Sequence, residues 1–189
     1  MMKQIPNYLT LFRIASVLVV YISFYVAAPL GHWLAVTAFT LGAMTDFFDG
    51  YLARKFDAET DFGRMFDPIA DKLMVLICLV MLISADIITP AHLPAALIII
   101  AREILVSGMR EFLNGRDVML PVSTLAKYKT FLQMIALGCL LAGPTGDALL
   151  PGLLDCGYTL LWLSALLTSI TGYNYLLSGL RHGGPKNDN

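Results

Sequence analysis

The sequence predicts an all-α integral membrane protein with six transmembrane helices, preceded by a short amphipathic helix at the membrane interface. Hydrophobic residues make up 57% of the 189 residues and charged residues only 14%, against roughly 25% charged residues in a soluble domain. The mean hydropathy is +0.70. Apolar stretches of about 20 residues, the length that crosses a bilayer, recur along the whole chain.

Six such stretches qualify as spans, and clusters of Gly, Pro and Asp separate them, as is typical of helix ends. The breaks are APLGH, the charged stretch 54–65, TPAHLP, NGRDVMLP and GPTGDALLPG. No repeat or low-complexity segment divides the chain, so we expect residues 1–189 to form a single membrane domain. The expected spans lie near residues 11–30, 32–53, 66–87, 91–113, 123–143 and 153–179.

The 13 Lys and Arg residues all fall on one side of this arrangement. The connections near 28–32, 87–92 and 144–152 contain none of them. Positive residues mark the cytoplasmic side of membrane proteins. We therefore expect a multi-pass protein of the cell inner membrane with both termini in the cytoplasm. The formal net charge of −1 gives no indication of nucleic-acid binding.

Residues 3–13 show an amphipathic spacing. Lys3, Asn7 and Thr10 recur at helical intervals, with apolar residues on the opposite face, and Pro6 suits a first helical turn. We expect a short helix in the cytoplasmic interface, although a solvated start of the first span fits the spacing equally well. The N-terminus lacks the apolar core and small-residue cleavage site of a signal peptide, so we expect the segment to be retained.

Four aspartates stand out in this apolar chain, within the stretch DFFDGYLARKFDAETDFGRMFDPIAD. At about 100° per residue, Asp46 and Asp49 share a face at the end of the second span. Asp67 and Asp71 share a face at the start of the third span by their four-residue spacing. The connector 54–65 brings these helix ends together as an antiparallel pair. We therefore expect all four carboxylates to converge in the cytoplasmic half of the membrane.

Three interpretations of this cluster compete. Salt-bridged helix ends would explain one or two aspartates, with Arg54, Arg64 and Lys72 as partners. A cation or proton pathway is the second, because ionisable groups inside membranes line transport routes. The broken helices and repeated halves of transporters are not evident in the sequence, however. A divalent metal site is the third, because hard cations take carboxylate oxygens and share their shell with substrate phosphates. Four carboxylates suit two ions and a diphosphate, and Gly50 and Ala53 leave room on the face shared with the first aspartate pair.

The stretch DFFDGYLAR, followed by GRMFDPIAD, resembles the signature of the CDP-alcohol phosphatidyltransferases, D-x2-D-G-x2-A-R-x8-G-x3-D-x3-D. Every specified position and the gap between the two halves match. The segments IPNYLTLFR, AREILVSGMREFL and LAKYKTFLQM are similar to segments of the branch that makes phosphatidylglycerol phosphate. The resemblance implies transfer of a phosphatidyl group from CDP-diacylglycerol to sn-glycerol-3-phosphate with release of CMP. It also implies a six-span fold in a phospholipid bilayer and a homodimer.

The resemblance also implies roles for individual residues. Mg²⁺ or Mn²⁺ would be bound, as about two ions, by the four aspartates, and Asp71 would also be the catalytic base. The nucleotide would lie near the helix face that carries the first aspartate pair and near an N-terminal patch. The residues implied for it are Gly50, Ala53, Arg54, Asn7 and Thr10, with Arg13 beside them.

The phosphate of the acceptor needs cations, and the fourth and fifth spans contain them. The candidates are Arg102, Arg110, Lys127 and Lys129. Arginine suits bidentate phosphate binding and lysine suits a point-charge contact. The preference for positive residues on the cytoplasmic side would by itself explain any one of these residues as well as phosphate binding does. Arg102 lies several residues inside its span and needs a partner, which Glu103 can supply. Lys127 and Lys129 lie about 200° apart in a regular helix, so both reach one ligand only if the helix begins between them.

Other functions remain open at the level of the sequence. Other branches of the family make cardiolipin, phosphatidylserine or phosphatidylinositol phosphate, and a neutral acceptor has no need of the basic set. An intramembrane prenyltransferase also holds a magnesium diphosphate with aspartates, but we expect more spans and a different aspartate spacing in that class. A cation transporter would show ion flux without dependence on a nucleotide.

Overall fold

The computed structural model describes residues 5–56, 61–114 and 124–182, with side chains described for residues 9–45, 69–113 and 128–173. All regular secondary structure in these ranges is helical, which confirms the predicted all-α class. The helices are α1 (Ile5–Ser23), α2 (Leu30–Phe56), α3 (Asp61–Ser84), α4 (Leu93–Asn114), α5 (Thr124–Leu149) and α6 (Leu153–His182).

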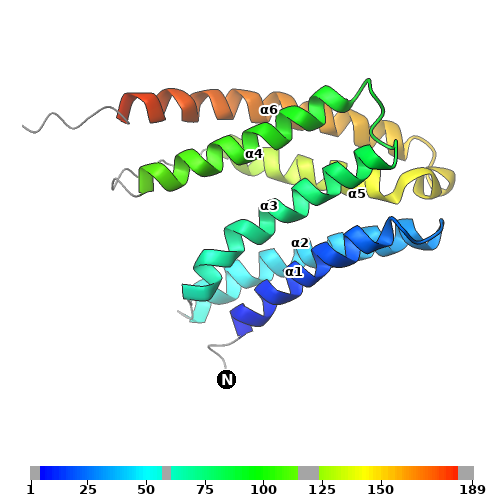
Figure 1. Ribbon diagram of the computed structural model, residues 1–189, viewed down its shortest axis with the longest axis horizontal. Helices are drawn as coiled ribbons and strands as arrows, with labels where there is room; N and C mark the ends of the chain where they lie inside the picture. The colour runs from blue at the N-terminus through cyan, green and yellow to red at the C-terminus, as the bar shows by residue number, and fades with distance from the viewer. Residues whose placement is uncertain (1–4, 57–60, 115–123, 183–189) are drawn as a thin grey trace, which may run out of the picture.

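The helices run alternately in opposite directions along one bundle. Figure 1 shows the α1–α2, α3–α4 and α5–α6 connections at its right-hand end. These connections contain no Lys or Arg. The starts of α1, α3 and α5 and the ends of α2, α4 and α6 lie at the opposite end, which we call the basic end. The sided charge distribution in the sequence therefore corresponds to the two ends of the fold.

Two groups of helices make up the bundle. In one group α1 packs against α2 and α3, and in the other α6 packs against α4 and α5, with α2 against α5 as the main link between them. Figure 1 shows α1, α2 and α3 diverging from α4, α5 and α6 toward the basic end. The groups are therefore held together mainly near the connections.

The apolar core draws residues from all six helices. Small side chains contribute to the buried core of α4, α5 and α6, and short side chains let helix backbones approach each other. Four alanines of these helices are at most 2% exposed, namely Ala95, Ala96, Ala136 and Ala165. The packing of this group therefore depends on short side chains.

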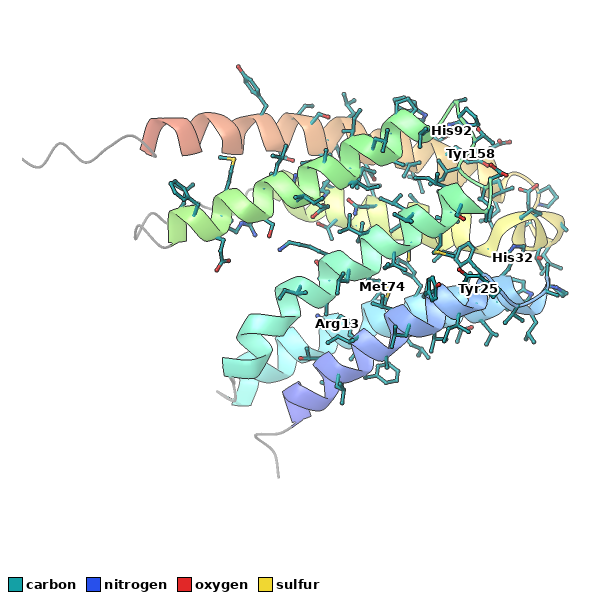
Figure 2. The ribbon with its side chains drawn as sticks, viewed as in Figure 1. Arg13, Tyr25, His32, Met74, His92 and Tyr158 are labelled. Atoms are coloured by element: carbon teal, nitrogen blue, oxygen red, sulfur yellow. The ribbon has the colours of Figure 1, made fainter. Side chains whose placement is uncertain are left out.

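Gly42 permits a similarly close approach where α1, α2 and α3 meet. A Cβ at this position would lie 2.6 Å from Met74 Cε and 3.3 Å from Ser16 Cβ. Met74 occupies this space from α3 (Figure 2). A larger side chain at position 42 would displace the end of the Met74 side chain and press on Ser16.

Two expectations about the helix ends are wrong in detail. Residues 5–13 are not a separate interfacial helix but the first part of α1, because neither Gly nor Pro interrupts the chain between Pro6 and Ser23. The connection between α2 and α3 is also shorter than the predicted 54–65, since α2 continues to Phe56 and α3 begins at Asp61. Residues with good helix propensity, such as the Ala, Arg and Lys at 53–55, extend α2.

The predicted break after residue 143 is present as a kink within α5. Gly143 has φ 56° and ψ −155°, a conformation that favours glycine, and Pro144 follows it. His32 of α2 packs at this kink, with its Nε2 3.0 Å from the position of a Cβ on Gly143. Its Nδ1 also hydrogen-bonds Thr145 Oγ1 at 2.7 Å. The regular part of α5 therefore ends close to the predicted position.

The length and composition of the helices show which of them could cross a membrane. Among the residues that the structure describes, Tyr128–Leu149 and Leu153–Tyr173 are long and apolar enough to cross a membrane. Leu9–Ser23 is apolar but shorter. In α4, Arg102 and Glu103 interrupt the apolar sequence. Six long helices are confirmed, whereas six membrane crossings are not established by composition alone.

An aromatic cluster ties α6 to the α3–α4 connection at the end opposite the basic end. The rings of His92 and Tyr158 stack with centroids 4.0 Å apart, as Figure 2 shows. Tyr158 donates a hydrogen bond to the Ile87 carbonyl at 2.6 Å, and Trp162 donates to His92 Nδ1 at 3.1 Å. These contacts hold the α3–α4 connection against α6.

Candidate active site

The four aspartates of the signature lie on helical segments at the basic end. Asp46 and Asp49 lie in about the last three turns of α2, and Asp67 and Asp71 in about the first three turns of α3. The side chains of Asp46, Asp49 and Asp67 lie outside the described set, so their convergence stays a prediction. Asp71 is described and is partly buried.

The residues predicted to bind the nucleotide lie on α1 and α2 at the same end. Thr10 is fully buried and Arg13 is 2% exposed, so both belong to the inner face of α1. Figure 2 labels Arg13 on this helix. The remaining candidates are helical, but their side chains lie outside the described part of the chain. These are Asn7 in α1 and Gly50, Ala53 and Arg54 in α2.

Glu103 of α4 is the centre of a buried charge cluster. Its Oε1 accepts hydrogen bonds from Lys129 Nζ of α5 and from Arg102 Nη1 at 3.4 Å. The Lys129 side chain is 3% exposed and that of Glu103 14%, and that of Arg102 is 13% exposed. Buried charges are tolerated when they are paired and hydrogen-bonded. The cluster therefore holds two cations around one carboxylate oxygen.

Asp71 and Lys129 connect this cluster to the aspartate signature. The Asp71 carboxylate on α3 lies close enough to the Lys129 ammonium for the two charges to attract each other, whereas Arg102 repels Lys129. Since Asp71 belongs to the signature and Lys129 to the predicted acceptor set, the structure brings one member of each together.

A cavity of about 190 Å³ opens beside the charge cluster. Arg102 and Arg110 both line it, so these two candidate residues face one space. Three of the lining side chains are cations and two are carboxylates, so the cavity favours a small anion. The lining consists of Lys72, Arg102, Glu103, Val106, Ser107, Arg110 and Glu111.

Lys127 and Lys129 could reach one ligand only if a helix began between them, and α5 does not begin there. Because α5 begins at Thr124, both lysines lie within the helix, with their positions about 200° apart around its axis. Lys129 belongs to the charge cluster. The side chain of Lys127 is outside the part that the structure describes, but its helical position is on roughly the opposite side.

Sequence comparisons give the family of this chain. A profile of the CDP-alcohol phosphatidyltransferases matches residues 3–170. The chain belongs to the CDP-alcohol phosphatidyltransferase family. The family signature predicted from the aspartates is therefore confirmed, and the cluster of Asp71, Glu103 and Lys129 lies within the matched region.

Relatives within the family cover nearly the whole chain. The chain is 49% identical over 174 residues to the CDP-diacylglycerol–glycerol-3-phosphate 3-phosphatidyltransferase of Rickettsia bellii, covering 92% of this chain and 93% of that protein. It is 50% identical over 175 residues to the Rickettsia typhi protein of the same name, with coverages of 92% and 96%. The protein of that name from Cereibacter sphaeroides is 38% identical over 212 aligned residues, with coverages of 94% and 96%.

Sequence reasoning missed part of this site. It proposed Glu103 as a partner for Arg102 but did not connect it with Lys129, and it gave Lys72 no role at the cavity. Adjacent opposite charges within the apolar stretch of α4 were the available signal. Thr171 was missed altogether, although its Oγ1 accepts a hydrogen bond from Arg102 Nη2 at 3.4 Å.

Proposed function

We propose that this chain transfers the phosphatidyl group of CDP-diacylglycerol to sn-glycerol-3-phosphate, giving phosphatidylglycerol phosphate and CMP. Family membership and relatives at 38% to 50% identity with that activity in their names support this reaction. The observation that carries the choice of acceptor is the cavity at the basic end that Lys72, Arg102 and Arg110 line, next to the ion pair of Glu103 and Lys129.

In the proposed reaction, a hydroxyl oxygen of glycerol-3-phosphate bonds to the phosphorus that carries diacylglycerol. The bond between this phosphorus and the CMP oxygen breaks, and CMP leaves. The hydroxyl proton passes to a carboxylate oxygen of Asp71, a general-base role that requires close positioning of the two groups. The partly buried position of Asp71, next in the chain to the cavity residue Lys72, supports this assignment.

The donor set of the signature fits a divalent metal. Asp46, Asp49, Asp67 and Asp71 provide only carboxylate oxygens, which suit Mg²⁺ or Mn²⁺. When bound, about two such ions would neutralise the diphosphate and stabilise the charge that develops on the leaving CMP. We assign the nucleotide to the residues of α1 and α2 at the same end, namely Gly50, Ala53, Arg54, Asn7 and Thr10.

Arg102, Arg110 and Lys129 are assigned to the phosphate of the acceptor. The arginines line the cavity and Lys129 shares the Glu103 carboxylate with Arg102. Lys127 is left out of this set because its helical position is about 200° from that of Lys129.

The surface of the bundle supports a location within a bilayer. Large apolar side chains are exposed on the outside of α1, α4, α5 and α6, such as Leu18 at 58%, Ile104 at 58%, Phe131 at 64% and Leu166 at 59%. Soluble proteins rarely expose apolar surface so widely. We propose that all six helices cross the inner membrane, with the basic end and the active site at the cytoplasm. We also propose a homodimer, as the family resemblance implies.

Competition between acceptors tests the proposed function. We expect purified protein with Mg²⁺ and CDP-diacylglycerol to favour glycerol-3-phosphate over serine by at least about 100-fold in kcat/KM, because a cationic site discriminates strongly against an acceptor without phosphate. Inositol phosphate has the charge but a bulkier body, so it should be used less well. CMP release measures all three reactions. Equal or better use of serine or inositol phosphate would assign the chain to another branch.

A further inference from the structure

The side chain of Arg102 packs against α6 at Gly172. A Cβ on Gly172 would lie 3.1 Å from Arg102 Cγ and 4.0 Å from its Nε. Gly172 is buried. The aliphatic part of Arg102 thus occupies the space that a side chain at position 172 would take. The absence of a side chain there lets Arg102 lie close to the α6 backbone.

The adjacent residue, Thr171, holds the other end of the Arg102 side chain. Thr171 is 3% exposed, and its hydroxyl donates to the Leu167 carbonyl at 2.9 Å. Because that donor is already used, a lone pair of Oγ1 is available to accept the hydrogen bond from Arg102 Nη2 at 3.4 Å. Nη1 meanwhile donates to Glu103 Oε1. One side of the guanidinium is therefore directed to α6 and another to Glu103.

We propose that Thr171 and Gly172 form a seat on α6 that fixes the Arg102 guanidinium for binding the acceptor's phosphate. The seat rests on the proposed function and adds two positioning residues to it. Both residues lie beyond the region 3–170 that the family profile matches.

The electrostatics of the cluster explain why such a seat is needed. Arg102 and Lys129 repel each other and share one oxygen of Glu103. If an acceptor phosphate draws Lys129 or Arg102 away from Glu103, the repulsion would displace the more mobile side chain. A long arginine side chain has many rotamers, and fixing it beforehand lowers the entropy cost of binding. The seat therefore acts on affinity for the acceptor and not on the phosphoryl chemistry.

Gly172→Ala tests the space in the seat. The added methyl meets only the flexible stem of Arg102, so we expect the protein to fold and the guanidinium to shift. The expected result is an increase of about tenfold in the KM for glycerol-3-phosphate, the effect of weakening one hydrogen bond to a charged group. The KM for CDP-diacylglycerol should be unchanged. Gly138→Ala is the matched control, because a Cβ there meets nothing within 4 Å, and it should behave as the wild type.

Thr171→Val tests the hydroxyl at almost constant shape. It should raise the KM for glycerol-3-phosphate several-fold, and Thr171→Ser should restore it, because serine returns the hydroxyl. A merely structural role predicts lower thermal stability in both Gly172→Ala and Thr171→Val without a selective effect on one substrate. An unchanged acceptor KM in both variants, or equal changes for both substrates, would overturn the seat.

Calorimetric titration with glycerol-3-phosphate in the absence of CDP-diacylglycerol separates this proposal from the proposed function. Wild-type protein that binds glycerol-3-phosphate but releases no CMP would contradict the proposed function, while weaker binding by Gly172→Ala would still support the seat. Turnover by the wild type, with equal glycerol-3-phosphate affinity in wild type and Gly172→Ala, would contradict the seat alone.

Discussion

Asp71→Asn is expected to lower kcat by about 10³-fold, within the range for loss of a general base. The amide has nearly the shape of the carboxylate but cannot take the acceptor's proton and is a weaker metal ligand. Asp71 is also the signature carboxylate that lies near Lys129, so its loss weakens the link between the two halves of the site. CMP release at saturating concentrations of both substrates measures the effect.

Asp155→Asn is the matched control for this variant. Asp155 lies in the first turn of α6, at the end of the bundle away from the signature, and undergoes the same chemical change. It should keep wild-type turnover, with at most a small loss of stability from the helix dipole. Binding of CDP-diacylglycerol by Asp71→Asn, measured by calorimetry, shows whether the site is still formed. Wild-type kcat in Asp71→Asn would remove this residue from the mechanism.

Lys129→Met is expected to have the second largest effect, on both stability and acceptor use. The Lys129 side chain is 3% exposed and pairs with Glu103, which is 14% exposed. Glu103 then keeps only the longer contact with Arg102 at 3.4 Å, so we expect a cost of about 2 kcal/mol in the free energy of unfolding, less than for a buried charge left with no partner. Loss of a charged contact to the phosphate should also lower kcat/KM for glycerol-3-phosphate by roughly 100-fold. Unfolding in detergent micelles and steady-state kinetics measure the two effects.

The double variant Glu103→Gln with Lys129→Met separates these effects. Removing both charges should recover part of the lost stability, because no carboxylate loses its main partner, although Arg102 then lacks the Glu103 carboxylate. It should not recover the use of glycerol-3-phosphate. If the double variant regains wild-type kcat/KM, Lys129 acts only through folding. If Lys129→Met itself keeps the acceptor KM of the wild type, Lys129 does not bind the phosphate.

The aspartate signature and the six helices were predictable from sequence because both depend on local spacing. The interval between Asp46 and Asp49, and that between Asp67 and Asp71, follows directly from the helical period. The positions of the helix ends were predicted less accurately. The charged residues of 54–65 resemble a loop by composition, whereas the helix propensity of Ala53, Arg54 and Lys55 lets α2 reach Phe56. Asp61 suits the first position of α3 because a negative charge is favoured at a helix N-terminus.

The pairing of Glu103 with Lys129 was not predictable because it depends on how α4 and α5 are placed relative to each other. Each of these helices packs against α6, so the position of α6 decides which side chains of α4 and α5 meet. The contact of Arg102 with Thr171 likewise depends on how α4 and α6 are placed relative to each other. Spacing along one helix gives the face of a residue, but the partner across helices depends on tertiary packing.

The most direct test of the proposed reaction measures both products in one assay. Purified protein would be incubated with Mg²⁺, CDP-diacylglycerol and labelled glycerol-3-phosphate, with the Rickettsia bellii relative as a positive control. We expect label to enter the lipid fraction in equal amounts with the CMP released, and we expect neither product after Mg²⁺ is chelated. CMP release without labelled lipid would indicate hydrolysis or another acceptor. Neither product, under conditions where the relative is active, would contradict phosphatidyl transfer by this chain.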